Sequence, residues 1–438
     1  MKIIKFKKFK SIDGFVDQNL KYLDVKKINL LEKYKSFSFI GKGNSISGLP
    51  YDNKSLLINY NIEDKFEFDK KKLELSVNGN IEVYKIHNYL LKKKLYFPSF
   101  PSYPNVTAAA CIANCVHGLN PKMGIIKDFV KEIKIYNPNF GFKTLSLKKN
   151  KKLFFLTIGG MGLTGLIINI KFKTLKLISS NLKIEKNIEF TDLIHMYKYL
   201  LNNNYFYNQN NIFIDLKRGK VLGRFSSGNL SKKKINLLFI SVKNINSIRL
   251  GFFKFSVFKK LFEKLILFKE QKFKKLNLHI NDAFYPSNSR LIYFNLMDKK
   301  FIEYQSIIPH SNVEPFLKEL KFMIDKHSPL ISLCHLKIFN GKSRYLQFDG
   351  KGLALSIHLT VNSKFNSFYK KLNNLNHKYN CKINIYKNSL VKIKDIKKSY
   401  GKNYDNFKRE IIKLNRKFFI VNRIFNDKNF YKRGLTDK

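Results

Sequence analysis

Residues 97–118 have the sequence FPSFPSYPNVTAAACIANCVHG, and residues 157–165 have the sequence TIGGMGLTG. The first stretch places Thr107 and a run of small residues shortly before His117. Glycine and alanine are typical of backbone that lies against a large flat ligand, because bulkier side chains would block the approach. Thr107 is also a suitable N-cap for a short helix over residues 108–114. The two stretches therefore predict ligand-contacting loops in an α+β domain.

The length and composition indicate a globular protein with room for two domains. The chain has 438 residues, of which 44% are hydrophobic and 15% aromatic. It contains no apolar run long enough to span a bilayer, and its N-terminus lacks the features of a secretory signal. We therefore expect a cytoplasmic protein without a membrane-spanning helix.

The formal net charge of +52 raises the question of an anionic partner. A nucleic-acid-binding protein gathers its basic residues in a patch, whereas the lysines here are spread along the whole chain. AT-rich codons alone would also produce much of this lysine excess. Diffuse positive charge is sufficient for attraction to an anionic membrane surface. Of the two anionic partners, the inner face of a membrane therefore fits the diffuse charge better than a nucleic acid does.

The cysteines do not indicate a metal site. Cys111, Cys115 and His117 are close in sequence, but zinc needs a further ligand, and no second ligand cluster is visible in the sequence. The chain has four cysteines and no CxxC pair. We predict that no metal is bound and that Cys111 and Cys115 pack as small apolar residues.

Hydrophobic periodicity and turn residues divide the chain into three segments. We predict an α+β domain over residues 1–175, a β-sheet covered by helices over 176–390, and a basic helical segment over 391–438 that packs back on the first domain. In the first segment we predict strands at 36–40, 55–60, 73–77, 80–83, 154–158 and 166–172, with a hairpin turn at Asn78-Gly79 and a helix at 84–94. In the second we predict strands at 235–242, 301–309, 331–339, 353–361 and 382–386 and helices at 313–325 and 365–379.

A further glycine-containing loop, Gly41–Ser45, follows the strand predicted at 36–40. The backbone amides of such a loop can form a concave site for a pyrophosphate. The loop lacks the third glycine of a dinucleotide-binding Rossmann fingerprint. Because short glycine turns are common, the loop gains significance only from its position before the two later stretches.

These blocks together resemble the PCMH-type FAD-binding domain of the vanillyl-alcohol-oxidase family, and within it the decaprenylphosphoryl-ribose 2'-oxidase branch. The order Pro104–Thr107, three alanines, Ile112–Asn114, His117-Gly118 and Asn120 follows the family pattern, as does the stretch at 157–165. The family's pyrophosphate loop matches at two positions, Gly43 and Ser45. The chain departs from the family at Asn44, Ile46, Ser47, Gly48 and Leu119, where the family usually has other residues. The resemblance covers nearly the whole chain and is thinner in the second domain.

The resemblance implies an FAD cofactor. We expect it to be non-covalent, because residues 41–48 contain no histidine or cysteine that could tether the flavin. The N-terminal amides of the helix at 108–114 are expected to meet a phosphate or the flavin pyrimidine edge. The cofactor-binding residues that the resemblance implies are Gly41, Gly43, Asn44, Ser45, Pro104, Val106, Thr107, Ala110, Asn114, His117, Gly118, Asn120, Gly159, Gly160, Gly162, Gly165 and Lys387.

The resemblance also implies a substrate site in the second domain. The expected substrate-binding residues are Glu303, Gln305, Lys337, Phe339, Gly352 and Ala354. Glu303 stands where the family has glutamine, and Ala354 stands where some relatives have a reactive cysteine. The expected catalytic residues are Lys387, His117 and Gln305. A lysine beside flavin N1/O2 would stabilise the negative charge of the reduced ring.

The activity implied is oxidation of a secondary hydroxyl of a sugar, including a polyprenyl-phosphate-linked pentose, by hydride transfer to flavin N5. The implied partners are an electron acceptor, either a quinone or oxygen, and a short-chain dehydrogenase/reductase that would complete an epimerisation. One alternative is an aldonolactone or alditol oxidase, but those relatives share a His-Trp-x-Lys motif and this chain contains no Trp. The other is a non-catalytic cationic scaffold that binds an anionic membrane or nucleic acid.

Overall fold

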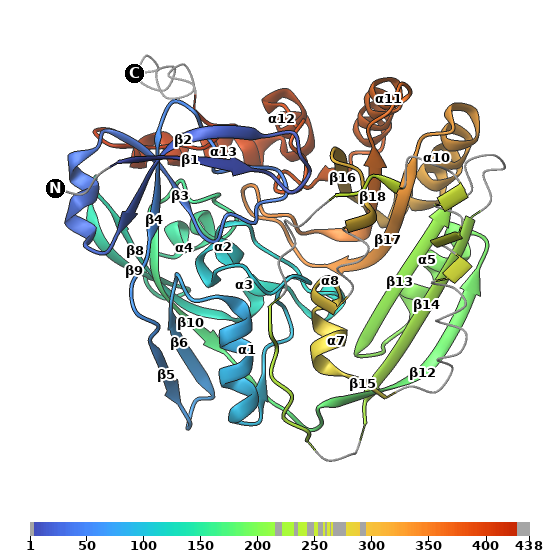
Figure 1. Cartoon of the computed structure of the whole chain (residues 1–438), viewed down its shortest axis with the longest axis horizontal. Coiled ribbons are helices and arrows are strands. Elements are labelled where there is room, and N and C mark those ends of the chain that lie inside the picture. Colours follow the sequence, from blue (N-terminus) through green and yellow to red (C-terminus); the bar gives the residue numbers. More distant parts are fainter. Residues whose placement is uncertain are drawn as a thin grey trace.

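The computed structural model describes residues 4–214, 221–231, 235–242, 249–252, 257–258, 261–262, 264–265, 277–289 and 295–426. Three large sheets organise this part of the chain, with the two smaller ones on the left of Figure 1 and the largest on the right. The chain is therefore of mixed helix and sheet, as its sequence predicts. No described helix is long and apolar enough to cross a membrane.

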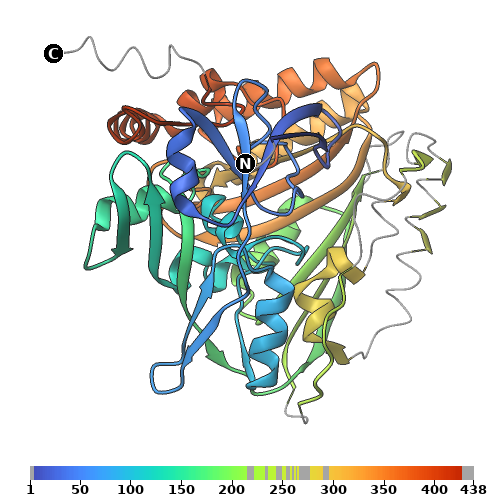
Figure 2. The same cartoon turned by 60° about the vertical axis from the view of Figure 1, so that its left-hand side comes forward.

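The first sheet has five strands and combines both ends of the described chain. Its order is β1 (Lys5–Lys10), β2 (Asp17–Val25), β4 (Leu56–Tyr60), β3 (Ser36–Ile40) and β20 (Phe419–Ile420). The short β20 pairs in parallel with β3. The C-terminal helices α12 (Ile393–Tyr400) and α13 (Lys402–Leu414) lie beside this sheet in both views (Figures 1 and 2). A 3₁₀ helix, η1 (Ile28–Lys33), connects β2 to β3.

The second sheet is antiparallel and carries the short helices that later frame the site. Its order is β5 (Phe66–Asp69), β6 (Glu74–Asn78), β10 (Leu166–Lys173), β8 (Val130–Asn137) and β9 (Gly141–Ser146). The helices of this region are α1 (Val83–Lys92), α2 (Ala108–Ala113), η2 (Pro121–Met123), α3 (Ile126–Phe129) and α4 (Lys151–Thr157). A two-stranded ribbon of β7 (Leu95–Tyr96) and β11 (Leu175–Lys176) follows.

The third sheet has eight strands and two different faces. Its order is β15 (Asn277–His279), β12 (Asn181–Phe190), β14 (Val221–Leu230), β13 (Tyr207–Ile214), β17 (Ile331–Asn340), β18 (Lys351–Thr360), β16 (Phe301–Pro309) and β19 (Lys382–Ile383). The other elements are α5 (Leu193–Asn202), α7 (Ile280–Phe284), α8 (Pro286–Ser289), η4 (His310–Asn312), α10 (Val313–His327) and α11 (Phe365–Lys378).

Along the central strands of the third sheet, side chains point alternately to two different cores, one on each face. Leu336, Leu355 and Ile357 belong to a core shared with α5, α10 and α11. Their neighbours Phe339 and Ala354 point the other way, into the core shared with α2 and α4. Successive residues of a strand face opposite sides, so this second face brings the sheet against the N-terminal part of the chain.

Three predicted strands, at 80–83, 154–158 and 235–242, are wrong. Residues 154–158 belong mostly to helix α4, because a short apolar run does not distinguish a buried helix from a strand. Residues 80–83 form no strand, and β6 pairs instead with β5. Gly79 is required for close packing rather than for a hairpin, since a Cβ there would lie 2.2 Å from the carbonyl oxygen of Ile167.

Residues 235–242 are described but belong to no strand. Their backbone is hydrogen-bonded by side chains instead of by a neighbouring strand. Asn88 accepts from the amide of Ile240 at 2.9 Å and donates to its carbonyl at 3.1 Å. Asn281 donates to the carbonyl of Leu238 at 2.6 Å. The strand predicted at 382–386 is also shorter, ending at Ile383, after which the chain turns into the site.

Candidate functional site

The three glycine-rich or small-residue segments meet at helix α2. At its N-terminal end, a Cβ on Gly41 would lie 2.6 Å from Thr107 Oγ1, and Asn44 Nδ2 donates to the carbonyl of Asn105 at 2.7 Å. At its C-terminal end, the amides of Gly159 and Met161 donate to the carbonyls of Ile112 (2.9 Å) and Ala113 (2.8 Å). Segments more than one hundred residues apart in sequence thus surround a single helix turn.

Two glycines in these segments leave open space. Gly43 and Gly162 have φ values of +76° and +78°, a backbone conformation that favours glycine. A Cβ on Gly162 would meet nothing within 4 Å, and a Cβ on Gly43 would meet its nearest atom, Tyr51 Oη, at 3.7 Å. Ala110 and Asn114, one turn apart on α2, are also partly exposed. These positions form a small-residue surface that a flat ligand could approach.

The remaining glycines of residues 157–165 allow close packing of the backbone. A Cβ on Gly160 would lie 2.2 Å from the carbonyl oxygen of Leu156, and one on Gly165 would lie 2.5 Å from that of Tyr136. Gly159 is buried, with its carbonyl accepting from the hydroxyl of Tyr386 at 2.8 Å.

The backbone amides at the start of α2 are not free to bind a ligand. The amides of Ala108, Ala109 and Ala110 donate to Ile81 O, Gly79 O and Thr107 Oγ1. The expectation that the N-terminus of this helix meets a phosphate is therefore wrong, because its donors are already used. Within the described part of the chain, the amides of Lys42, Gly43 and Ser45 donate no hydrogen bond. An anion would find its donors in this loop.

Other predicted cofactor residues have structural partners. The carbonyls of Pro104 and Val106 accept from the amides of Tyr84 and Val83 at the start of α1. Ser45 Oγ accepts from the amide of Leu49 at 3.3 Å.

A segment from the C-terminal part of the chain bridges the glycine-rich loops. Ser47 Oγ donates to the carbonyl of Tyr386 at 2.9 Å, and Ser389 Oγ donates to the carbonyl of Ser47 at 2.9 Å. Because the Tyr386 hydroxyl also holds Gly159, residues 386–389 connect the loop at 41–48 to the stretch at 157–165. Lys387 lies inside this bridge.

The three predicted catalytic residues belong to one polar cluster on the second face of the third sheet. His117 Nε2 lies 3.4 Å from Gln305 Oε1, and Lys387 Nζ lies 2.5 Å from Glu303 Oε1. Gln305 and Glu303 are two residues apart on β16, so both point to this face. Ser356 Oγ on β18 donates to Glu303 Oε1 at 3.2 Å.

Burial and charge set opposite protonation states in this cluster. Burial, together with the positive charges of Lys337 and Lys387, lowers the pKa of His117 to about 3, so its imidazole is neutral at pH 7. Burial alone would raise the pKa of Glu303, but the Lys387 ammonium and nearby histidines lower it to about 2. The cluster therefore combines a neutral imidazole with an ion pair.

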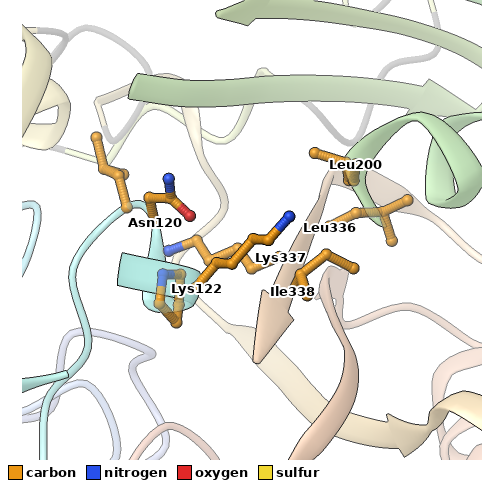
Figure 3. A pocket seen from close by; sticks show the side chains of 8 residues that line it. Asn120, Lys122, Leu200, Leu336, Lys337 and Ile338 are labelled. Atoms are coloured by element: carbon orange, nitrogen blue, oxygen red, sulfur yellow. The ribbon is translucent and has the colours of Figure 1, made fainter. Parts of the chain in front are cut away.

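Lys337 lines a small hollow beside this cluster, with about 10 Å³ of room for a water-sized molecule (Figure 3). Its ammonium donates to the carbonyl of Gly118 at 3.2 Å. Burial and the positive charge of Lys387 lower the pKa of Lys337 to about 7. The described residues that line the hollow include a second lysine and no acid: Leu119, Asn120, Pro121, Lys122, Leu200, Leu336, Lys337 and Ile338.

Replacing Lys337 by Met is expected to stabilise the fold below pH 7. The folded state disfavours the ammonium, so the unfolded chain binds the proton more tightly between pH 7 and about 10.5. Wild-type stability should therefore rise with pH across this window. At pH 6, Lys337→Met should raise Tm by about 2 °C or more, and the gain should vanish near pH 10. The exposed Lys351→Met is the control, and an equal gain in it would contradict the assignment.

The other predicted substrate residues lie near the cluster but are packed. The Phe339 ring contacts that of His117 edge-on, with centroids 5.2 Å apart. A Cβ on Gly352 would lie 2.0 Å from Ile308 O, so glycine is needed there for strand packing. Ala354 is 1% exposed, in the core. Asn120, which was predicted to bind the cofactor, lines the hollow instead and donates to the carbonyl of Tyr205 at 3.1 Å.

Sequence reasoning missed several members of the cluster. Asn384 Nδ2 donates to Gln305 Oε1 at 2.6 Å. Ser356 and His358 alternate with apolar residues along β18, and His358 is the partner of Glu303 in the strand register. The alternation of these two polar residues with apolar ones was the feature of the sequence that could have identified them.

The arrangement places small-residue segments next to a buried polar cluster. Among the described residues, no group of three or more His, Cys, Asp or Glu side chains could hold a metal ion, and all four cysteines are free and buried. No protein-family model and no curated protein matches the chain.

Proposed function

We propose that the chain is an FAD-dependent oxidoreductase that oxidises a secondary hydroxyl of a sugar. The observation that carries the proposal is the convergence at α2 of three small-residue segments with the bridge that holds Lys387. The cluster of His117, Gln305 and Lys387 lies next to that convergence. The PCMH-type FAD-binding fold and its pairing with a substrate domain belong to the same proposal.

The residues present fit FAD. Gly43 and Gly162 leave room for close approach, and the amides of Lys42, Gly43 and Ser45 are available to a pyrophosphate. Residues 41–48 supply no tethering side chain, so the cofactor would dissociate on denaturation. When bound, FAD would supply the acceptor for the hydride from the alcohol carbon.

The chain's own side chains would then orient the substrate. Glu303 holds the ammonium of Lys387 in place at 2.5 Å, as a fixed positive charge beside the reaction. Gln305 carries a side-chain amide that would orient the sugar hydroxyl. The aromatic wall of Phe339 and Phe348 against His117 excludes water.

For the substrate we propose a sugar that carries a phosphate, such as a polyprenyl-phosphate-linked pentose. The support is the small hollow beside Gly118, whose described lining residues include the buried Lys337 and no carboxylate. A quinone or oxygen would reoxidise the flavin, and a short-chain reductase would reduce the keto-sugar. The net charge of +52 supports peripheral association with an anionic membrane on the cytoplasmic side.

The visible absorption spectrum of the purified chain, recorded before and after acid precipitation, tests the proposal. We expect bands near about 370 and 450 nm that appear in the supernatant, as for a dissociable flavin. Candidate sugars would then be screened by bleaching of the longer-wavelength band. A colourless chain that also fails to take up added FAD would overturn the proposal and favour a non-catalytic scaffold.

A further inference from the structure

We infer that Nε2 of His117 accepts the proton of the substrate hydroxyl, and that Asn384 is the positioning residue that prepares it for this role. The inference rests on the proposed function. It goes beyond it by assigning the proton acceptor and by naming a residue that sequence reasoning did not single out.

The orientation of Asn384 is fixed by its backbone neighbour. The amide of Tyr386 donates to Asn384 Oδ1 at 3.0 Å, which identifies that atom as the oxygen. Its Nδ2 must then be the donor to Gln305 Oε1 at 2.6 Å. The backbone supports the same pairing, since the Asn384 amide donates to the Gln305 carbonyl at 2.8 Å. Asn384 is 4% exposed, so water does not replace these partners.

The orientation of Gln305 follows from that of Asn384. Because Asn384 donates to Gln305 Oε1, the atom that faces His117 Nε2 at 3.4 Å is an oxygen. The other ring nitrogen, Nδ1, lies 3.0 Å from the carbonyl oxygen of Gly118. Both nitrogens of His117 therefore face acceptors.

A neutral imidazole carries one N–H and can satisfy only one of two acceptors. The shorter contact, from Nδ1 to Gly118 O, takes that hydrogen. Nε2 is left with a bare lone pair directed at Gln305 Oε1. A proton that arrives at Nε2 would convert this second contact into a hydrogen bond. The carbonyl oxygens of Gly118 and Gln305 are thus placed to accept hydrogen bonds from both nitrogens of a protonated ring. Before the reaction, however, the ring is neutral.

The surrounding charges keep the ring neutral until a proton is delivered. The groups that act on it are the ammonium groups of Lys337 on β17 and of Lys387, whose partner Glu303 is on β16. With burial, the two cations lower the pKa of His117 to about 3, while the two carbonyls act in the opposite direction.

The step balances as an alcohol oxidation. The carbon loses its hydrogen with two electrons to the flavin that the proposed function supplies. The hydroxyl loses its proton to His117 Nε2, and a C=O bond forms. The hydroxyl becomes strongly acidic as the hydride leaves, so a weak base is sufficient to accept the proton. The imidazolium then returns the proton to solvent.

The tautomer of His117 in the full chain tests the inference. The chain has nine histidines. In ¹⁵N-histidine spectra of the FAD-loaded protein, the signal lost in His117→Gln should show a protonated Nδ1 and a bare Nε2 throughout pH 5–9. In Asn384→Leu, Gln305 can rotate and donate its amide to Nε2, so the Nε2 signal should shift to that of a hydrogen-bonded acceptor. An Nε2–H tautomer in the wild type would overturn the inference.

Activity gives the second readout. His117→Gln should lower kcat by a factor of about one hundred or more. Asn384→Leu should lower kcat at least tenfold with little change in KM, because Nε2 is then occupied. The matched control is Asn376→Leu, a buried asparagine of α11 that donates to the hydroxyl of Tyr304 and to the carbonyl of Leu372. A chain that binds no flavin overturns both proposals, whereas a flavin-loaded chain with the wrong tautomer overturns this one alone.

Discussion

Gly162→Asn is expected to weaken FAD binding at least tenfold while the chain still folds. Gly162 has a φ of +78°, and a Cβ there would meet no atom of the described chain within 4 Å. Asparagine tolerates this conformation better than other non-glycine residues, so little strain is added. Its side chain would occupy the open space beside α2, which we assign to the cofactor. A tenfold loss corresponds to about 1.4 kcal/mol of binding free energy.

Gly141→Asn is the matched control. Gly141 has a φ of +73° and an equally open environment, but it lies at the start of β9, in the hairpin with β8. Both variants should show wild-type circular dichroism and similar Tm values, and only Gly162→Asn should lose flavin fluorescence quenching during titration with FAD. Equal affinities of the two variants would show that the space beside Gly162 is not part of the cofactor site.

The sequence predicted the central elements of the third sheet closely. Strand β16 matches the predicted range 301–309, and α10 begins at Val313 as predicted. Helix α10 has a clear period, because one of its faces lies in the helix-covered core. Strand β16 is a short run that is buried on both faces. The error at 154–158 arose from a misleading period. Phe154, Leu156 and Ile158 are buried at the two-residue spacing typical of a strand, but Thr157 between them is buried as well and the segment is helical.

The site was predictable where its chemistry is local and not where it depends on long-range contacts. Gly43 and Gly162 were predicted as cofactor residues from the glycine-containing stretches and the resemblance, and both lie at open positions with positive φ. Asn384 was not, because its role depends on Gln305, 79 residues earlier. Which backbone amides are free to bind a ligand could not be predicted from the sequence either. Those of α2 are used by Ile81 and Gly79, which only the folded packing brings into range.

Lys387→Met is expected to destabilise the chain by about 3 kcal/mol at pH 7. Lys387 Nζ lies 2.5 Å from Glu303 Oε1, and Glu303 is 8% exposed. Removing the ammonium leaves a buried carboxylate without its cation, which costs more than the pair itself contributes. Urea unfolding at pH 7, followed by circular dichroism, measures the loss. A variant as stable as the wild type would show that solvent or other groups compensate the charge.

The pH dependence of stability should change sign with this substitution. In the wild type, the pKa of Glu303 is about 2, below its ordinary value near 4.5, so the carboxylate contributes stability above pH 4.5 that is lost as the pH falls towards 2. In Lys387→Met, burial dominates and raises that pKa above its ordinary value. The folded state then holds the proton more tightly than the unfolded chain, and stability should fall as the pH rises from 5 to 7.

The double variant Glu303→Gln with Lys387→Met separates stability from chemistry. It removes both charges, so most of the lost stability should return, and the pH dependence between 5 and 7 should disappear. It should nevertheless remain inactive, because the cation beside the reaction is still absent. Recovery of activity together with stability would show that Lys387 serves only to neutralise Glu303. Recovered folding without recovered activity would leave transition-state charge stabilisation as the role of the Lys387 ammonium.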